Sequence, residues 1–322
     1  MKLKTFALLT TTALAAAFVG AAAVGQPTTG TVESHMAMAK VAAGDDNQRL
    51  YGALCEQPAA GPNTGGPRPD PERSTWHVEP VKVFDNLYFV GEKEYSAWAV
   101  NTSDGIILID TIWHYSVADE VEGGLRKLGL DPARLKYAIV SHAHIDHIGG
   151  AKYLQEKFGT RIILSEVDWQ LAETSTRLPS KPKRDMIAYD GQKLTLGDTT
   201  LTLYLTPGHT LGTVSVLIPV KDNGKPHLVA EWGGTGFNFE HSRERFQTYV
   251  ASAERFGDIV AKSGADALIA NHTNLDGSKV KLPALAARKG GDENPWVIGN
   301  TAVRGYVKVA EECARASLLQ EK

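Results

Sequence analysis

Three histidines and one aspartate lie within six residues of each other, at His142, His144, Asp146 and His147. Neutral imidazole nitrogens and carboxylate oxygens are good ligands for zinc and similar divalent metals. His142 and His144 are two residues apart, so both can point to one side of an extended or turning backbone, whereas Asp146 and His147 are adjacent and diverge. The spacing indicates that one metal takes the first pair and a second metal takes the second pair. A polar loop with chance histidines is the alternative, and the density of this scarce residue type argues against it.

The histidine cluster lies where a predicted strand ends and a predicted helix begins. Residues 135–140 are short, apolar and β-branched, which is typical of a buried strand. Residues 149–159 carry apolar side chains at helical spacing and end in a glycine. Open α/β sheets place their sites at such strand ends. We therefore expect further ligands downstream.

Two later histidines occupy the same kind of position. His209 follows an apolar strand at 200–205, and His272 follows another at 267–270. A lone histidine is more often a structural residue. Because both lie just past an apolar strand, we interpret both as metal ligands.

The elements around these residues predict two sheets packed face to face, with helices outside. Strands are expected at 81–84, 87–90, 97–100 and 106–109, and the tight turns between them imply antiparallel pairing. The polar loop at 174–190, which includes Arg177, is interpreted as solvated. The other expected elements are a helix at 117–128, a strand at 161–164, a helix at 166–173, hairpins at 193–196 with 200–205 and at 214–220 with 227–230, and helices at 243–262 and 295–319, the last with proline at its start.

The composition is that of an ordinary globular protein. The chain has 322 residues, of which 43% are hydrophobic and 22% charged, so it is long enough for a substantial core. A net charge of -3 without any run of Lys or Arg argues against a nucleic-acid partner. We expect a small-molecule substrate. The oligomeric state stays open, with a monomer favoured.

The N-terminus predicts export. Residues 1–25 have a basic start, an apolar stretch rich in small residues and an Ala-Ala-Ala cleavage site, as in a secretory signal peptide. An N-terminal membrane anchor is the alternative. We expect cleavage, a periplasmic or secreted protein and no membrane contact afterwards. Residues 26–75, rich in Ala, Gly and Pro, are interpreted as an extension with a possible short helix at 46–55, and residues 76–322 as the catalytic domain.

The two cysteines leave two interpretations open. In an oxidising compartment, Cys55 and Cys313 could form one disulfide that ties the extension to the C-terminal helix. The alternative is two unpaired thiols. Neither cysteine lies in a metal-ligand spacing.

The motifs together resemble those of the metallo-β-lactamase superfamily. The resemblance rests on His-x-His-x-Asp-His, on Pro-Gly-His-Thr around His209 and on the strand-end histidine at 272, and it extends from 76 to roughly 319. Residues 100–110 look like the family's opening strand motif. Within the superfamily the chain is most similar to the third subclass of the class B β-lactamases, which Asn271 and residues 294–296 also resemble. The resemblance implies an α/β fold, the four-layered αβ/βα sandwich.

The resemblance also implies a ligand set and a reaction. His142, His144 and His209 would hold one Zn²⁺, and the second of the two ions would be held by Asp146, His147 and His272. Asp146 would also orient a hydroxide shared by the two ions, which attacks the lactam carbonyl of a β-lactam antibiotic. Trp113, His114 and Thr235 are tentative substrate contacts, and Phe237 and Asn274 lie on loops that could line the mouth of the site. The subclass usually places small hydroxyl residues near 235, and here Thr235 stands alone beside glycines.

Other functions on the same scaffold stay open. Lactonases and glyoxalase-type thioesterases of the superfamily use a bridging Asp before the last histidine, and residues 227–236 contain no Asp, which favours the β-lactamase. Glu231 could replace that bridge, or it could be a surface residue or lie behind the ligands. The alternatives are a zinc hydrolase acting on a lactone, thioester or phosphoester and a non-catalytic exported zinc-binding protein. An iron-dependent oxidoreductase fits the nitrogen-rich ligand set less well.

Overall fold

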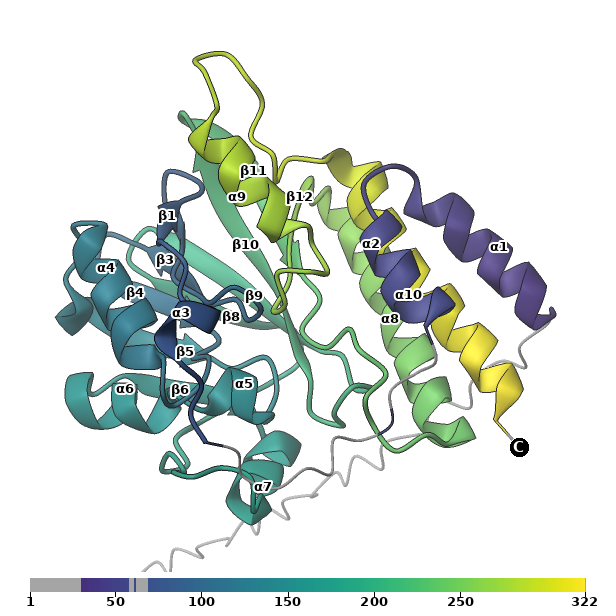
Figure 1. Ribbon diagram of the computed structural model, residues 1–322, viewed down its shortest axis with the longest axis horizontal. Coiled ribbons are helices and arrows are strands. Elements are labelled where there is room, and N and C mark those ends of the chain that lie inside the picture. The colour runs from purple at the N-terminus through teal and green to yellow at the C-terminus, as the bar shows by residue number, and fades with distance from the viewer. Residues whose placement is uncertain (1–29, 58–60, 62–68, 322) are drawn as a thin grey trace, which may run out of the picture.

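Two β-sheets face each other at the centre of the protein, and helices cover the outer face of each sheet (Figure 1). The computed structural model describes residues 30–57, 61 and 69–321, so the predicted signal peptide at 1–25 lies outside the described residues. Within the described part of the chain, no helix combines the length and the apolar character needed to cross a membrane.

The first sheet has seven strands in sequence order. Its N-terminal half is antiparallel, as the tight turns predicted, and from β4 onward its strands pair in parallel because helices connect them. The strands are β1 (Val81–Lys82), β2 (Leu87–Phe89), β3 (Trp98–Asn101), β4 (Ile106–Ile109), β5 (Leu135–Ile139), β6 (Arg161–Ser165) and β7 (Met186–Ala188).

The second sheet has five strands in the order β12-β11-β10-β9-β8. The hairpin of β10 and β11 turns at Asn223 and Gly224, both with positive φ, as its Asp-Asn-Gly sequence favours. Only β12 pairs in parallel, with β11. The strands are β8 (Gln192–Leu196), β9 (Thr199–Leu205), β10 (Val214–Asp222), β11 (Lys225–Glu231) and β12 (Ala267–Ile269).

The helices flank these sheets or precede them in the chain. They are α1 (Val32–Ala43), α2 (Gln48–Tyr51), the π-helical turn η1 (Gly52–Glu56), α3 (Arg73–Trp76), the π-helical turn η2 (Ala118–Glu122), α4 (Gly123–Lys127), the 3-10 turn η3 (Pro132–Arg134), α5 (Ile145–Ile148), α6 (Ala151–Phe158), α7 (Glu166–Thr174), α8 (Arg243–Ser263), α9 (Ser278–Ala286) and α10 (Gly299–Gln320).

Three apolar clusters define the layers. One lies between the sheets and includes Trp98 and Ile218. A second joins the first sheet to α4, α6 and α7, with Trp169 fully buried. The third joins the second sheet to α8 and α10 through residues such as Phe256 and Tyr306. This order of helix, sheet, sheet and helix confirms the αβ/βα sandwich.

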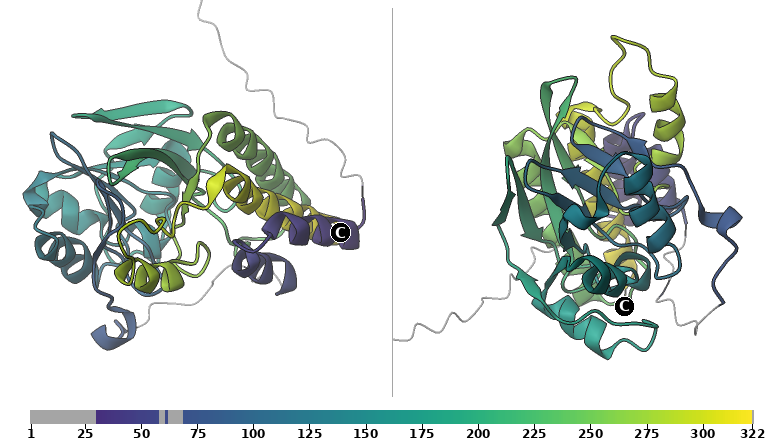
Figure 2. Two further views of the ribbon diagram at one scale, coloured as in Figure 1. Left: turned by 90° about the horizontal axis from the view of Figure 1, so that it is seen from above. Right: turned by 90° about the vertical axis from the view of Figure 1, so that its left-hand side faces the viewer.

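The N-terminal extension contains the possible short helix at 46–55, as α2 and η1, and also α1, which the sequence analysis did not predict. Helix α1 begins with a capping box at Thr31 and Ser34 and lies along α10, where His35 pairs with Glu312 in a buried contact (Figure 2). The disulfide left open by the sequence is present. It joins Cys55 in η1 to Cys313 in α10, with the two Cα atoms 5.1 Å apart.

The last helix starts later than predicted. We expected it to begin at 295, but α10 begins at Gly299. Trp296 is fully buried and its carbonyl accepts a hydrogen bond from the amide of Leu268, while Val297 forms an antiparallel bridge with Ala267. Because these residues extend the edge of the second sheet, they cannot be helical. Helix α9 and strand β7, the latter within the expected loop 174–190, were also missed.

Candidate metal centre

The five histidines and one aspartate singled out from the sequence meet where strand-end loops of both sheets converge. His142 and His144 follow β5, His209 follows β9, and His272 follows β12. The residues form two groups, and within each group the potential ligand atoms lie within 4.8 Å of one another. The groups are His142, His144 and His209, and Asp146, His147 and His272.

The spacing within each group fits a divalent metal. In the first group, Nε2 of His209 lies 3.0 Å from Nε2 of His142 and 3.0 Å from Nδ1 of His144. In the second, Oδ2 of Asp146 lies 3.3 Å from Nε2 of His147 and 3.6 Å from Nε2 of His272. Tetrahedral zinc with bonds of about 2.0 Å places its ligand atoms about 3.3 Å apart. Each group could therefore hold one ion.

The outer nitrogens of the rings fix how the histidines are oriented. Nδ1 of His142 lies 2.9 Å from the carbonyl of Gly233, and Nδ1 of His209 lies 2.7 Å from the carbonyl of Gly236. A carbonyl can only accept, so Nδ1 must donate, and Nε2 of a neutral ring keeps its lone pair for a metal. In the second group, Nε2 of His147 is buried and has no hydrogen-bond partner among the described residues. A bound metal would give this nitrogen a partner.

Asp110 organises the second group, a role that the sequence analysis missed. Its Oδ2 accepts a 2.8 Å hydrogen bond from Nδ1 of His147, and its two oxygens also accept from the amide and hydroxyl of Ser141 at 2.7 and 2.9 Å. Its backbone has φ of 58°, which is costly for a residue with a side chain. The signal in the sequence was an aspartate directly after an apolar strand.

Asp168, on α7, ties together the two loops of the first group and was also missed. Its Oδ2 accepts 2.8 Å hydrogen bonds from the amide of Ala143 and from the hydroxyl of Thr210. Burial raises the pKa of Asp168 to about 6. A Cβ at Gly212 would lie 2.4 Å from its Oδ1, so only glycine permits this approach.

Burial and charge set the protonation of the ligands. Burial lowers the pKa of His144 and of His272 to about 4, and it lowers the pKa values of His142 and His209 well below the usual value. Burial opposes the charge of Asp146, but the neighbouring histidines, His147 first, lower its pKa overall.

His147 differs from the other four histidines. Burial lowers its pKa, but the carboxylates of Asp146 and Asp110 outweigh that and raise it to about 10. At neutral pH the metal-free site therefore has four neutral imidazoles, an ionised aspartate and His147 in its charged imidazolium form. A metal that binds His147 must displace the extra proton of that ring.

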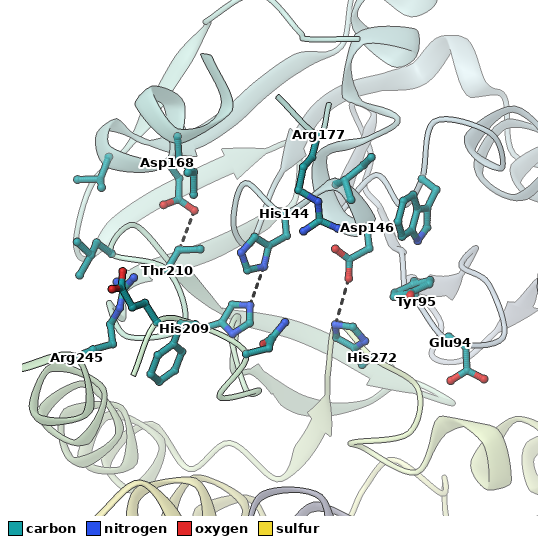
Figure 3. A pocket seen from close by; sticks show the side chains of 18 of the residues that line it. Glu94, Tyr95, His144, Asp146, Asp168, Arg177, His209, Thr210, Arg245 and His272 are labelled. Atoms are coloured by element: carbon teal, nitrogen blue, oxygen red, sulfur yellow. Dashed lines mark hydrogen bonds and ion pairs between the residues drawn. The ribbon is translucent and has the colours of Figure 1, made fainter. Parts of the chain in front are cut away.

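A cavity of about 570 Å³ opens on the two groups (Figure 3). His144, Asp146, His209 and His272 line it, and Figure 3 shows the guanidinium of Arg177 extending toward His144 and Asp146. The loop around Arg177 was interpreted as solvated, so this position was missed as well. Trp113, a tentative substrate contact, and Asn274, which was expected on a loop at the mouth of the site, also line this cavity.

His114 and Thr235 lie elsewhere. Nε2 of His114 is 3.1 Å from Oδ1 of Asp70, and His114 is not among the residues that line the cavity. Thr235 lines a second cavity of about 240 Å³, but the residue is 2% exposed and its hydroxyl lies 3.2 Å from that of Tyr306. The structure therefore brings only Trp113 of the three tentative contacts to the main cavity.

Glu231 is buried and is not a surface residue. It belongs to neither ligand group, and both its carboxylate oxygens lack a hydrogen-bond partner among the described residues. Burial raises its pKa well above the usual value, with Asp110 adding to the effect. The geometry therefore does not favour a bridging role for Glu231.

Comparisons with known proteins place the motifs in a known group. Residues 90–222 match the model of the metallo-beta-lactamase superfamily. The hydroxyacylglutathione hydrolase of Acidiphilium cryptum is 37% identical over 84 residues, 26% of this chain and 31% of the relative. An N-acyl homoserine lactonase from Bacillus sp. is 31% identical over 127 residues, 38% of this chain and 48% of the relative. The chain thus spans less than half the length of these curated relatives.

Solved structures match over more of the chain. BJP-1, a subclass B3 metallo-beta-lactamase of Bradyrhizobium japonicum, is 27% identical with a TM-score of 0.63, covering 73% of this chain and 91% of that chain. A mutant metallo-beta-lactamase from Cronobacter sakazakii is 30% identical with a TM-score of 0.60, covering 73% and 94%. FEZ-1 from Legionella gormanii, 23% identical with a TM-score of 0.63 over 78% and 94%, shares the fold.

Proposed function

Because the chain belongs to the metallo-beta-lactamase superfamily, we propose that it uses two zinc ions to hydrolyse the amide bond of β-lactam rings. More coarsely, it is a hydrolase of that superfamily. The observation that carries the β-lactam proposal is the ligand set, three histidines in one group and Asp146, His147 and His272 in the other. Residues 227–236, the region where lactonases and thioesterases of the superfamily would supply a bridging Asp, contain no Asp, and Glu231 in that region is buried outside both groups.

Each group would hold one ion. When bound, zinc supplies a nucleophile at neutral pH by lowering the pKa of water to about 7, and it polarises a carbonyl oxygen. In the second group Oδ2 of Asp146 faces His147 and His272, which leaves its other oxygen to accept a hydrogen bond from the attacking water. Trp113 and Arg177 line the cavity around the reacting carbonyl, one apolar and one cationic, and would orient a substrate that has both kinds of group.

A second candidate function is hydrolysis of a thioester or a lactone. The matches to a hydroxyacylglutathione hydrolase and to an N-acyl homoserine lactonase favour it. The solved structures that cover most of the chain favour the β-lactam instead. A non-catalytic zinc-binding protein would have the same ligands but turn over no substrate of any class.

We also propose that the protein is exported to the periplasm or secreted, and that it acts on a small molecule and not on nucleic acid. The disulfide between Cys55 and Cys313 supports export, since disulfides persist in oxidising compartments. Finding the processed protein in the periplasmic or culture fraction would support export, and full-length protein in the cytoplasm would contradict it.

The deciding experiment tests the purified, zinc-loaded protein against penicillins, cephalosporins, carbapenems, an acyl homoserine lactone and a glutathione thioester, with and without a chelator. We expect chelator-sensitive opening of at least one β-lactam class, and two zinc ions per chain by elemental analysis. Opening of only the lactone or the thioester would establish the second candidate. No turnover of any substrate by the zinc-loaded protein would contradict both.

A further inference from the structure

Two cavities meet at the candidate metal centre. The first has a volume of about 570 Å³ and the second about 240 Å³. Both are lined by His209, His272, Asn238 and Asn274, so they adjoin on either side of the ligands. A substrate whose reacting carbonyl lies at the metals would thus have space on both sides.

The two cavities differ in charge. Carboxylates and guanidinium groups line the first, among them Glu94, Arg177, Glu240 and Arg245. Of the described residues that line the second, none is Asp, Glu, Lys or Arg. Its wall instead combines apolar side chains such as Phe237 and Leu275 with neutral amides. An ionic group would lose hydration there without gaining a partner of opposite charge.

The N-terminal extension forms one wall of the second cavity. Ala53, Leu54 and Gln57 line it, although they precede His142 by more than 80 residues in the chain. Leu54 is 7% exposed and belongs to the core cluster that includes α8 and α10. The next residue, Cys55, is bonded to Cys313. The wall is therefore fixed to the domain by apolar packing and by a covalent bond.

We propose that the second cavity is a binding subsite for an uncharged acyl or alkyl group of the substrate, and that η1 of the extension sets its size limit. This inference rests on the proposed hydrolytic function and names which part of the substrate lies on which side of the metals. A volume of about 240 Å³ equals that of about eight liquid water molecules, so the part of the group inside the cavity would have about eight non-hydrogen atoms.

The test measures binding, so it needs no turnover. Straight-chain alkyl hydroxamates, from acetohydroxamate to decanohydroxamate, are titrated into the zinc-loaded protein by calorimetry. Burial of each added methylene should tighten binding about fourfold until the subsite is full, after which the gain stops. A wild-type protein without any dependence on chain length would overturn the proposal.

Variants assign the dependence to the extension. Leu54→Trp should fill the subsite and abolish the dependence on chain length, with acetohydroxamate affinity unchanged within about twofold, while Leu54→Met should behave as wild type. Leu211→Trp, at an exposed position of the first cavity, is the matched control and should keep the dependence. If the dependence of affinity on alkyl chain length survives in Leu54→Trp, or is lost in Leu211→Trp, the alkyl chain lies in the first cavity and the proposal is refuted.

A second variant guards against misfolding of Leu54→Trp. Ala53→Leu is a smaller change at a half-buried position of η1, and it should move the preferred chain length down by about two methylenes. An unchanged optimum in a folded Ala53→Leu protein would overturn the proposal. The outcome is separate from that of the proposed function, since hydroxamate preference persists in a protein that opens no β-lactam, and β-lactam hydrolysis persists in one without the preference.

Discussion

The two candidate metal sites use similar ligands but are held in different ways. Backbone carbonyls fix the rings of His142 and His209 in the first group, whereas the carboxylate of Asp110 fixes His147 in the second. A carbonyl holds a neutral ring in place, while a carboxylate also stabilises the protonated ring. The ring nitrogens of the first site therefore have free lone pairs for a metal, whereas the second site must release a proton before it binds a metal.

Removing a ligand from the first group should have the largest effect. His209→Ala should lower kcat/KM by about a thousandfold or more, because several kcal/mol of transition-state stabilisation would be lost with the ion. Steady-state rates on the best substrate, together with zinc content, measure this. His241→Ala, at a partly exposed histidine outside both groups, is the control and should change little. Equal activities of the two variants would refute the role of the first group.

Asp110→Asn should weaken the second site selectively. Loss of the carboxylate behind a metal-ligating histidine typically costs about 10- to 100-fold in metal affinity. Titration with zinc against a chromophoric chelator should show this loss for one ion and an unchanged affinity for the other. Asp104→Asn, at an exposed aspartate, should leave both affinities unchanged. Equal weakening of both ions in Asp110→Asn would show that the two sites are not held independently.

The pH dependence of metal binding should separate the two sites. The pKa of His147 in the metal-free protein is raised to about 10, so below that pH zinc must displace one proton from this ring. The zinc affinity of the second site should therefore rise about tenfold per pH unit from about pH 6 to about pH 9. His144 has a pKa lowered to about 4, so affinity at the first site should be nearly constant over that range. Zinc titrations at several pH values check this, and parallel slopes for both ions would contradict it.

Thr210→Val should have the smallest effect. It removes the hydroxyl that donates to Asp168 and costs about 1 kcal/mol in the free energy of unfolding, with the bond from Ala143 retained. Denaturant unfolding measures the loss, and Thr210→Ser, which keeps the hydroxyl, should stay close to wild type. A loss in Thr210→Ser equal to that in Thr210→Val would show that the methyl group matters, and not the hydrogen bond.

The sequence revealed the residues that meet at the site, but not those that hold them in place. His209 and His272 could be found because each follows an apolar strand, a signal that is local in the chain. Asp168 could not, because its role depends on the amide of Ala143 and on Thr210, which are distant in sequence and close only after folding. The side of a loop that faces a cavity is equally non-local, which is why Arg177 was interpreted as solvated.

The fold shows the same division. The antiparallel start of the first sheet followed from short turns between apolar runs, and it is confirmed. Helix α1 was missed because its sequence, Val32–Ala43, lacks a strong apolar stripe and its contacts are with α10, at the other end of the chain. The start of α10 was misplaced because proline is a common first residue of helices, which favoured a start at Pro295. Here the residues after Pro295 pair with β12 instead.

The bond between Cys55 and Cys313 makes most of the polypeptide a closed ring. It spans 258 positions, and all six candidate ligands lie between the two cysteines. A protease that cuts once inside this ring would leave both pieces linked, so the clipped protein would migrate as one species on a gel until a reductant is added. Because the six candidate ligands lie inside the ring, a single cut there would not separate them from one another.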